Sequence, residues 1–168
     1  MTPTVPSLLV PFMWNHVRRT FDWVCDPEFR RVFLMRNTPT WESHLAYFRE
    51  TLADPNQRVY AILLAGQHVG NCGFKNLAPQ GRTGELWLYV GDPSLRGKGV
   101  GLSATGLLVK EGFETLGLET ILLHVAEFNI PARRLYERLG FVEVPMSTDA
   151  CEWVDRGFRV IRMKLEKV

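Results

Sequence analysis

A glycine-rich turn, RGKGVG at residues 96–101, has the residue types needed to bind a phosphate group. Arg96, Gly99 and Gly101 give the spacing RxxGxG, directly before an apolar helical pattern. Glycines let the main chain approach a ligand closely, and the N–H groups at a helix start point towards an anion that the helix dipole favours. No Ser or Thr follows Lys98 to bind a metal. The pattern predicts a loop that holds a pyrophosphate without transferring it, with a tight structural connection as the alternative.

Two other phosphate-binding motifs fit this turn poorly. A Walker A loop needs a glycine five residues after Gly91, and Arg96 stands there. Residues 99–104, GVGLSA, do satisfy GxGxxA, and Glu119 stands twenty residues after Gly99. That fingerprint belongs to the first strand of a repeated βαβ unit and places its acid at the end of the second strand, whereas Glu119 opens a strand. Spacing therefore favours the RxxGxG interpretation.

The turn lies inside an alternating series of strands and helices. Residues 58–74 predict a hairpin that turns near Gly66, and TGELWLYV at 83–90 predicts a third strand. The remaining expected elements are a helix at 100–115, a strand at 119–127, a helix from Pro131 to Gly140, and strands at 141–146 and 158–165.

The N-terminal part predicts helices after a loose start. Residues 1–11 contain three prolines and predict an extended lead-in. Helices are expected at 15–25 and 27–36, and a third begins with Thr38 as its cap and Pro39 in its first position. This third helix ends at Asp54-Pro55. The whole chain, 1–168, then predicts a single α/β domain with a mixed, twisted sheet.

Composition excludes several function classes. The net charge of +2 offers no dense basic face for nucleic acid. Cys25, Cys72 and Cys151 show no CxxC spacing, so we expect neither a metal site nor disulfides, and a reducing, cytoplasmic location. The apolar stretch at 8–14 is too short for a membrane span and lacks the basic start of a signal peptide.

A second motif, NIPARRLYERLGF at 129–141, makes the pattern specific. Together with YVGDPSLRGKGVG at 89–101, it resembles the acetyl-coenzyme A (acetyl-CoA) binding core of the GNAT superfamily of N-acetyltransferases, over residues 58–142. The resemblance implies a GNAT-like fold with antiparallel N-terminal strands, one parallel strand-helix-strand crossover and flanking helices. It also implies acetyl-CoA as cosubstrate and no metal. The coenzyme pyrophosphate is expected on Arg96, Gly97, Lys98, Gly99, Val100 and Gly101.

The resemblance assigns further roles near the thioester. The main-chain N–H groups around Leu88, Tyr89 and Val90 are expected to contact the carbonyl, where this strand parts from its parallel neighbour. Tyr136 matches the general acid that protonates the leaving thiolate, and Asn129 matches a residue that binds the coenzyme or an ordered water. A phenol with a pKa of about 10 stays protonated at neutral pH and can protonate a thiolate. The alternative for Tyr136 is a core aromatic.

The general base follows from strand alternation. Glu85, Trp87 and Tyr89 share one face of the third strand. A carboxylate between aromatic rings can have a raised pKa and accept a proton, so Glu85 is the expected base. A solvent-exposed strand glutamate is the alternative, and the neighbouring-strand His124 as well as His44 and His68 remain further options.

The N-terminal helices carry the expectation for the substrate. FDWVCDPEFRRVF and residues 39–62 are similar to GNAT members that acetylate nucleotide-linked amino sugars, including the enzyme type of pseudaminic acid biosynthesis. Trp14, Trp23 and Trp41 could stack on a base or sugar. Residues 113–121 are similar to acetyltransferases of protein N-termini and of aminoglycoside-type antibiotics, which stay open, as do a non-catalytic acetyl-CoA sensor and a homodimer.

Overall fold

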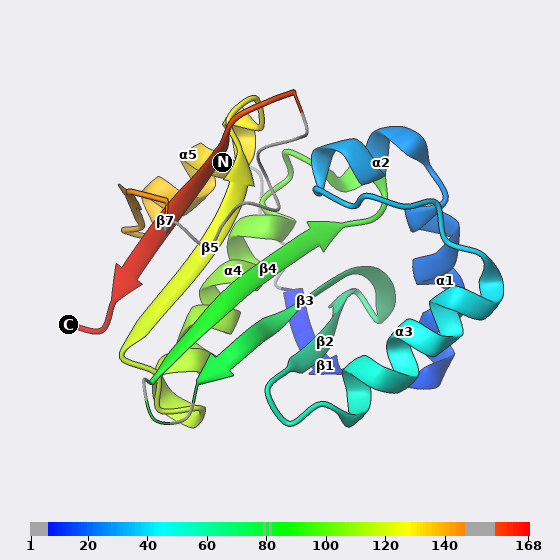
Figure 1. The fold of residues 1–168 in the computed structure, drawn as a ribbon, viewed down its shortest axis with the longest axis horizontal. Helices are drawn as coiled ribbons and strands as arrows, with labels where there is room; N and C mark the ends of the chain where they lie inside the picture. Colours follow the sequence, from blue (N-terminus) through cyan, green and yellow to red (C-terminus); the bar gives the residue numbers. More distant parts are fainter. Residues whose placement is uncertain (1–6, 79, 81, 147–156) are drawn as a thin grey trace.

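Seven strands form one mixed sheet in the part of the chain that the computed structural model describes, residues 7–78, 80, 82–146 and 157–168 (Figure 1). The strands are β1 (Ser7–Pro11), β2 (Arg58–Leu64), β3 (Gln67–Ala78), β4 (Thr83–Val90), β5 (Thr120–Ala126), β6 (Val142–Val144) and β7 (Val160–Glu166). They lie in the order β1-β2-β3-β4-β5-β7-β6. Neighbours are antiparallel except β4 and β5, which run parallel. The predicted fold class is confirmed.

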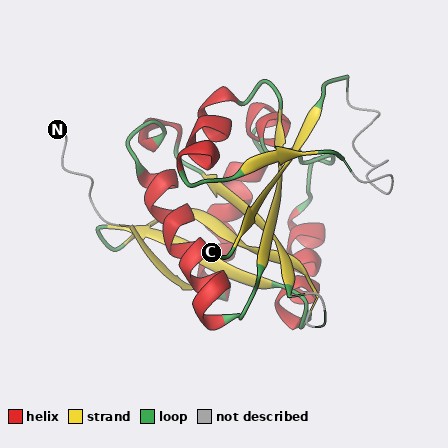
Figure 2. Cartoon of the chain, turned by 90° about the vertical axis from the view of Figure 1, so that its left-hand side faces the viewer, coloured by secondary structure: helices red, strands yellow, loops and turns green. Residues whose placement is uncertain are grey.

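Helices cover both faces of this sheet (Figures 1 and 2). They are α1 (Trp14–Val24), α2 (Pro27–Val32), α3 (Trp41–Ala53), α4 (Val100–Lys110), which continues as a π-helical turn at Glu111–Thr115, and α5 (Ile130–Arg138). A 3-10 turn at Pro93–Leu95 precedes α4. α4 and α5 share one apolar core with the sheet, and α1–α3 share two smaller ones on its other side. None of the described helices is long and apolar enough to cross a membrane.

The two faces of β4 separate the core from the site. Leu86 and Val90 are buried in the core that includes α4, with Leu88 packed against it. Trp87 and Tyr89 pack with residues of α1 and α2 on the opposite face. Alternation along β4 is therefore as predicted, because consecutive side chains of a strand point to opposite faces.

β4 and β5 pair over only part of their length. Their parallel ladder joins Thr83–Glu85 to Thr120–Leu122, and then the strands diverge. β4 runs on to Val90 and β5 to Ala126 without further pairing between them. The divergence opens the predicted slot in the sheet, at the carboxyl ends of the two parallel strands.

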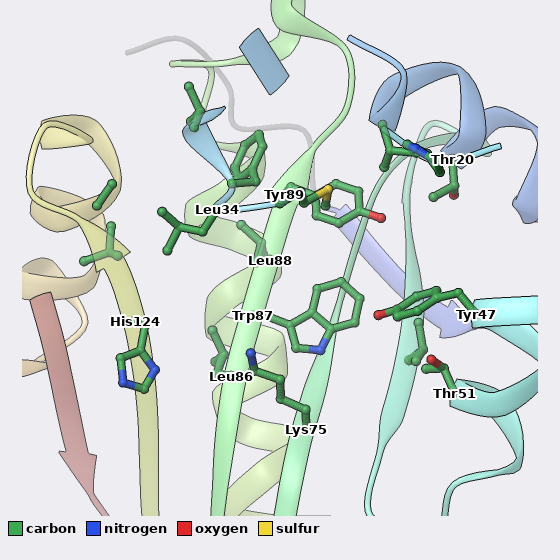
Figure 3. A pocket seen from close by; sticks show the side chains of 18 of the residues that line it. Thr20, Leu34, Tyr47, Thr51, Lys75, Leu86, Trp87, Leu88, Tyr89 and His124 are labelled. Atoms are coloured by element: carbon green, nitrogen blue, oxygen red, sulfur yellow. The ribbon is translucent and has the colours of Figure 1, made fainter. Parts of the chain in front are cut away.

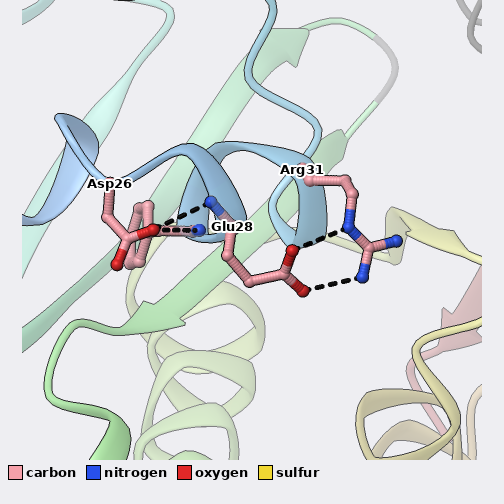
Figure 4. Close-up of polar contacts among 4 residues, drawn as sticks. Asp26, Glu28 and Arg31 are labelled. Atoms are coloured by element: carbon pink, nitrogen blue, oxygen red, sulfur yellow. Dashed lines mark hydrogen bonds and ion pairs between the residues drawn. The ribbon is translucent and has the colours of Figure 1, made fainter.

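The short helix α2 lies beside the open end of this slot (Figure 1). Asp26 caps it, since its Oδ1 accepts hydrogen bonds from the main-chain N–H of Glu28 at 2.8 Å and of Phe29 at 3.3 Å. Arg31 donates two hydrogen bonds to Glu28, at 2.9 and 2.7 Å (Figure 4). The Arg31 guanidinium also stacks 4.4 Å from the ring of Phe128, just after β5. α2 is thus connected to the β5 rim of the slot.

The expectation of a loose lead-in is wrong for residues 7–11. They form β1, which pairs antiparallel with β2 from Ser7↔Leu64 to Pro11↔Tyr60. A proline is tolerated here because β1 is an edge strand and Pro11 is its last residue. Residues 1–6 of the expected lead-in lie outside the described residues.

The expected start of the third helix is also wrong, by two residues. Thr40 caps α3, because its Oγ1 accepts a hydrogen bond from the Ser43 N–H at 3.1 Å while the Ser43 hydroxyl accepts one from the Thr40 N–H at 2.9 Å. This reciprocal capping box satisfies two donors that a cap at Thr38 would leave unpaired. Pro39 therefore precedes the helix.

Cys25 and Cys72 are free thiols, and Cys72 is buried. Cys151 lies outside the described residues.

Candidate active site

A cavity of about 600 Å³ occupies the divergence of β4 and β5 and extends under α3 (Figure 3). Figure 3 shows Trp87 and Lys75 beside β4, His124 on β5, and Tyr47 and Thr51 projecting from α3. The described residues of the strands, of α5 and of its N-cap that line it are Val59, Lys75, Leu86, Trp87, Leu88, Tyr89, His124, Val125, Ala126, Asn129, Ala132, Leu135 and Tyr136. The cavity therefore joins the slot, the start of α5 and the N-terminal helices in one space.

The main chain of β4 presents alternate residues to the slot. The N–H of Gly91 donates to the Val69 carbonyl on β3 at 2.8 Å, while the Arg82 carbonyl accepts from Glu119 on the β5 side at 2.8 Å. In an extended strand, the N–H and C=O groups of consecutive residues point to opposite edges. The N–H groups of Leu88 and Val90 therefore point towards the slot, and the N–H of Tyr89 points towards β3. The expected contact of the Tyr89 N–H with a thioester carbonyl is therefore corrected, and Leu88 and Val90 remain candidates.

The glycine-rich turn joins the end of β4 to the start of α4. Gly97 and Gly99 adopt left-handed backbone conformations, with φ of 73° and 83°, and Gly99 is the N-cap of α4 without a capping side chain. The first N–H groups of α4 therefore lack a side-chain cap from this residue. Arg96 reaches the Val90 carbonyl through Nε at 3.5 Å, and its guanidinium lies 5.6 Å from the Phe33 ring. The turn has the geometry that an anion-binding loop needs.

Tyr136 and Asn129 line the cavity from α5 and its N-cap. Tyr136 is 7% exposed and packs against Phe141. Burial raises the pKa of its phenol to about 12, so the hydroxyl stays protonated over the working range of pH. Asn129 caps α5 by accepting a hydrogen bond from the Ala132 N–H at 3.4 Å. It therefore has a structural role beside the expected coenzyme contact.

Glu85 lies in a cluster of charged groups rather than among aromatic rings alone. Its carboxylate contacts His124 Nδ1 at 2.8 Å and Lys75 Nζ at 3.2 Å, and it accepts a hydrogen bond from Asn76 Nδ2 at 3.0 Å. Burial by itself raises the pKa of Glu85, but the hydrogen bond to His124 and the charge of Lys75 outweigh it and hold the pKa at about 2. The expectation of a raised pKa is wrong, because strand alternation shows the ring neighbours on β4 but not the partners on β3 and β5.

The other candidate histidines are held by buried partners. His44 Nε2 contacts the Val17 carbonyl at 3.0 Å, although its ring also borders the cavity. His68 Nε2 contacts Asn71 Oδ1 at 2.7 Å, and Asn71 donates hydrogen bonds to Thr20 and Tyr89. Burial lowers the pKa of both histidines. These contacts fix the wall formed by α1 and α3 to the sheet.

The tryptophans expected to stack on a substrate do not line the cavity. Trp14 is exposed, Trp23 packs against His68, and Trp41 packs against Phe21. Trp87 lines the cavity instead. Trp87 lies on the face of β4 that strand alternation assigned to the site, so the sequence pattern could have identified it. Lys75 could not be identified in this way, because its position depends on the register of β3 against β4.

The half of the cavity under α3 is aromatic and polar but carries no carboxylate among the described lining residues. Its described polar residues besides Lys75 and the histidines are Thr20, Asn37, Thr38, Ser43, Tyr47, Thr51 and Gln57. No group of three metal-binding side chains occurs in the described ranges.

The diverging parallel strands, the cavity at their divergence and the glycine-rich turn before α4 are the features expected of an enzyme that transfers an acyl group from coenzyme A. The chain belongs to the GNAT acetyltransferase family, since residues 7–142 match the family model "Acetyltransferase (GNAT) domain". It is an acetyl-CoA-dependent N-acetyltransferase.

The chain is similar to several acetyltransferases. An N-acetyltransferase 9-like protein of Caenorhabditis briggsae is 25% identical, over 94% of this chain and 81% of the relative. Acetyltransferase PseH of Campylobacter jejuni is 27% identical, over 76% of this chain and 77% of the relative. The crystal structure of spermidine N-acetyltransferase from Vibrio cholerae with CoA and spermine has a TM-score of 0.83 at 20% identity, over 95% of each chain. That structural likeness shows a common fold.

Proposed function

We propose that this enzyme acetylates the primary amine of a nucleotide-linked amino sugar. The observation that carries the proposal is the chemistry of the described acceptor wall, which combines the rings of Trp87 and Tyr47 with several hydroxyl and amide groups and has no carboxylate among its lining residues. Aromatic faces and uncharged hydrogen-bonding groups suit a sugar. The similarity to acetyltransferase PseH agrees with the resemblance to amino-sugar acetyltransferases.

A polyamine is a poorer fit to the same wall. Spermine is a flexible polycation, and its recognition calls for several carboxylates in or near the cavity. The similarity to a spermidine N-acetyltransferase is at the level of the fold. A protein amine is the second candidate, because an alpha/beta-tubulin-N-acetyltransferase 9 of Mus musculus is 24% identical over 83% of this chain.

In the proposed complex, the coenzyme pyrophosphate binds at the glycine-rich turn. The N–H groups of Gly97, Gly99 and Gly101 and of Lys98 and Val100 surround the anion, and Arg96 and Lys98 supply positive charge. The N–H groups of Leu88 and Val90 are positioned to stabilise the developing oxyanion of the thioester, and Asn129 binds the coenzyme or a water molecule.

The acetyl group moves by direct attack. The neutral amine nitrogen bonds to the thioester carbonyl carbon, the carbon–sulfur bond breaks, and the Tyr136 hydroxyl donates its proton to the departing sulfur. The raised pKa of Tyr136 means that its hydroxyl still carries its proton when the amine attacks.

A thiol-release assay with four acceptors tests the substrate. The acceptors are a nucleotide-linked amino sugar, the same amino sugar without its nucleotide, spermidine, and a peptide with a free N-terminus. We expect the highest kcat/KM for the first, at least about tenfold above the second, because the diphosphate contributes binding energy. A highest value for spermidine or the peptide contradicts the proposal and assigns the enzyme to that class.

We also propose a homodimer as its assembly. One solved spermidine N-acetyltransferase of this fold is dodecameric, which supports oligomerisation as a property of such enzymes. Light scattering of the purified protein distinguishes a dimer from a monomer and from a larger ring.

A further inference from the structure

Glu85 and His124 meet where β4 and β5 begin to diverge. Glu85↔Leu122 is the last parallel pair of the two strands, and His124 follows two residues later on β5. The two side chains therefore share the face of the sheet that carries the acceptor half of the cavity, and His124 lines it. Both side chains are mostly buried, with 13% of Glu85 and 14% of His124 exposed. The Glu85–His124 contact therefore lies at the closed end of the slot, where the pairing of β4 and β5 stops.

We infer that His124 takes the proton from the acceptor amine and that Glu85 acts through it as a positioning residue. The inference rests on the proposed direct transfer to an amine, but not on which amine is used. Part of the support for this inference is geometric, because His124, Tyr136 and Leu88 line the same cavity. An acceptor amine in that cavity can contact His124 while the thioester carbonyl that it attacks lies in the slot.

The hydrogen bond fixes the chemistry of the histidine ring. An ionised carboxylate is only an acceptor, so Nδ1 of His124 donates the N–H to Glu85. In the neutral ring, Nε2 then carries the lone pair that can take a proton. After proton transfer, the carboxylate stabilises the imidazolium, as in other base–carboxylate pairs.

The proton balance is complete with groups already described. The ammonium form of the acceptor gives one proton to His124 Nε2 and becomes the nucleophilic amine. After the attack on the thioester carbonyl, the nitrogen must lose one further proton to become an amide nitrogen. Tyr136 donates its hydroxyl proton to the departing sulfur and then takes this proton from the nitrogen. His124 then releases its proton to solvent, which leaves the amide, free CoA and one proton.

The charged residues that share this face of the sheet with His124, among the described residues, include Glu85, Lys75, Arg162 and Lys164. Glu85 and Lys75 approach His124 from β4 and β3, and Lys75 Nζ lies 3.2 Å from the shared carboxylate. Arg162 is the cross-strand partner of His124 on β7, and Lys164 is two residues further along that strand on the same face.

The tautomer of His124 is the first test, and it requires no substrate. We expect the ¹⁵N NMR spectrum of the free enzyme above the midpoint of the ring titration to show a protonated Nδ1 and an unprotonated Nε2. In Glu85→Gln the preference for protonated Nδ1 should weaken. A wild-type ring protonated on Nε2 overturns the inference, whatever amine the enzyme uses.

Kinetics give the second test. With the best acceptor of the panel, His124→Gln should lower kcat by about 10²- to 10⁴-fold and remove the acid limb of the pH–rate profile. Glu85→Gln should lower kcat at least about tenfold, with an unchanged Kd for acetyl-CoA. Added imidazole should restore part of the activity of His124→Ala.

Glu119→Gln is the matched control, because Glu119 pairs with Arg82 at 2.7 Å at the opposite end of the same strands and does not line the cavity. Its activity should equal that of the wild type. Wild-type kcat and pH profile in His124→Gln overturn the inference. A preference for spermidine or the peptide, with these effects intact, contradicts the proposed substrate and supports the role of His124.

Discussion

At the scale of single residues, the Tyr136 hydroxyl offers the cleanest test of the transfer step. The ring is buried in the core that α5 shares with the sheet, so Tyr136→Phe keeps its packing and removes one oxygen. We expect kcat to fall by about 10²-fold or more, with a Kd for CoA within about twofold of the wild type. Steady-state kinetics and calorimetry measure the two quantities. Wild-type turnover in this variant removes Tyr136 from the mechanism.

The site residues show which side chains sequence patterns can assign. The RxxGxG turn and Tyr136 belong to local motifs, so the sequence could assign the turn to the start of α4 and Tyr136 to α5, where Tyr136 lines the cavity. The partners of Glu85 do not, because Lys75 and His124 reach it through the pairing of three strands. The direction of the Tyr89 N–H likewise depends on which edge of β4 faces β3.

At the scale of elements, the start of α4 depends on the conformation of Gly99. An L side chain at its φ of 83° is strained by about 1–2 kcal/mol, and relieving that strain shifts the first N–H groups of α4, which are proposed to bind the pyrophosphate. We expect Gly99→Ala to lower both the Tm and the affinity for CoA, measured by thermal denaturation and calorimetry.

Gly117→Ala is the control for Gly99→Ala. Gly117 has a φ of 66° with open space around it, and it lies in the connection between the π-helical turn and β5. It should lose similar stability and keep its affinity for CoA. Equal losses of affinity in both variants would assign the effect to folding instead of the loop.

The helices α1 and α3 are attached to the sheet in a way that acid should weaken. Burial lowers the pKa of His16, His44 and His68 from the ordinary value of 6.5, so these histidines bind protons at a lower pH in the folded chain than in the unfolded chain. The free energy of unfolding should therefore be constant above about pH 7 and fall as the pH drops below 6.5, by at most about 1.4 kcal/mol per pH unit for each histidine.

Urea unfolding at pH 7.5, 6.0 and 5.0 measures this slope. His44→Gln, which keeps a donor for the Val17 carbonyl, should make the slope shallower. A wild-type free energy that does not change between pH 7.5 and 5.0 contradicts the prediction.

Elements with strong local signals were predicted well, and those that depend on distant pairing were not. The hairpin at Gly66, the helix after the glycine-rich turn and the strand with His124 follow from period and turn residues. β1 was missed because the prolines at positions 3, 6 and 11 argue against a strand, and its pairing partner β2 lies about fifty residues further along the chain. The cap of α3 was displaced because two threonines flank Pro39 and local rules fit both.

At the scale of the whole molecule, coenzyme binding should stabilise the fold strongly. The slot separates the two parts of the sheet, and a ligand in it contacts β4, β5 and α5 together. At a concentration of about 100 times its Kd, acetyl-CoA contributes about 2.7 kcal/mol. For a chain of this size, we expect a rise in Tm of roughly 5–10 °C. Differential scanning fluorimetry measures it, and an unchanged Tm contradicts binding at the slot.

The early divergence of β4 and β5 has a consequence for the life of the protein. β4 and β5 pair at only three positions, so the coenzyme that we propose to bind between them would supply the remaining contacts across the middle of the sheet. Newly made chains in a cell starved of the acetyl donor should therefore open more often and meet proteases sooner. Abundance of the enzyme would then follow the supply of its own cosubstrate.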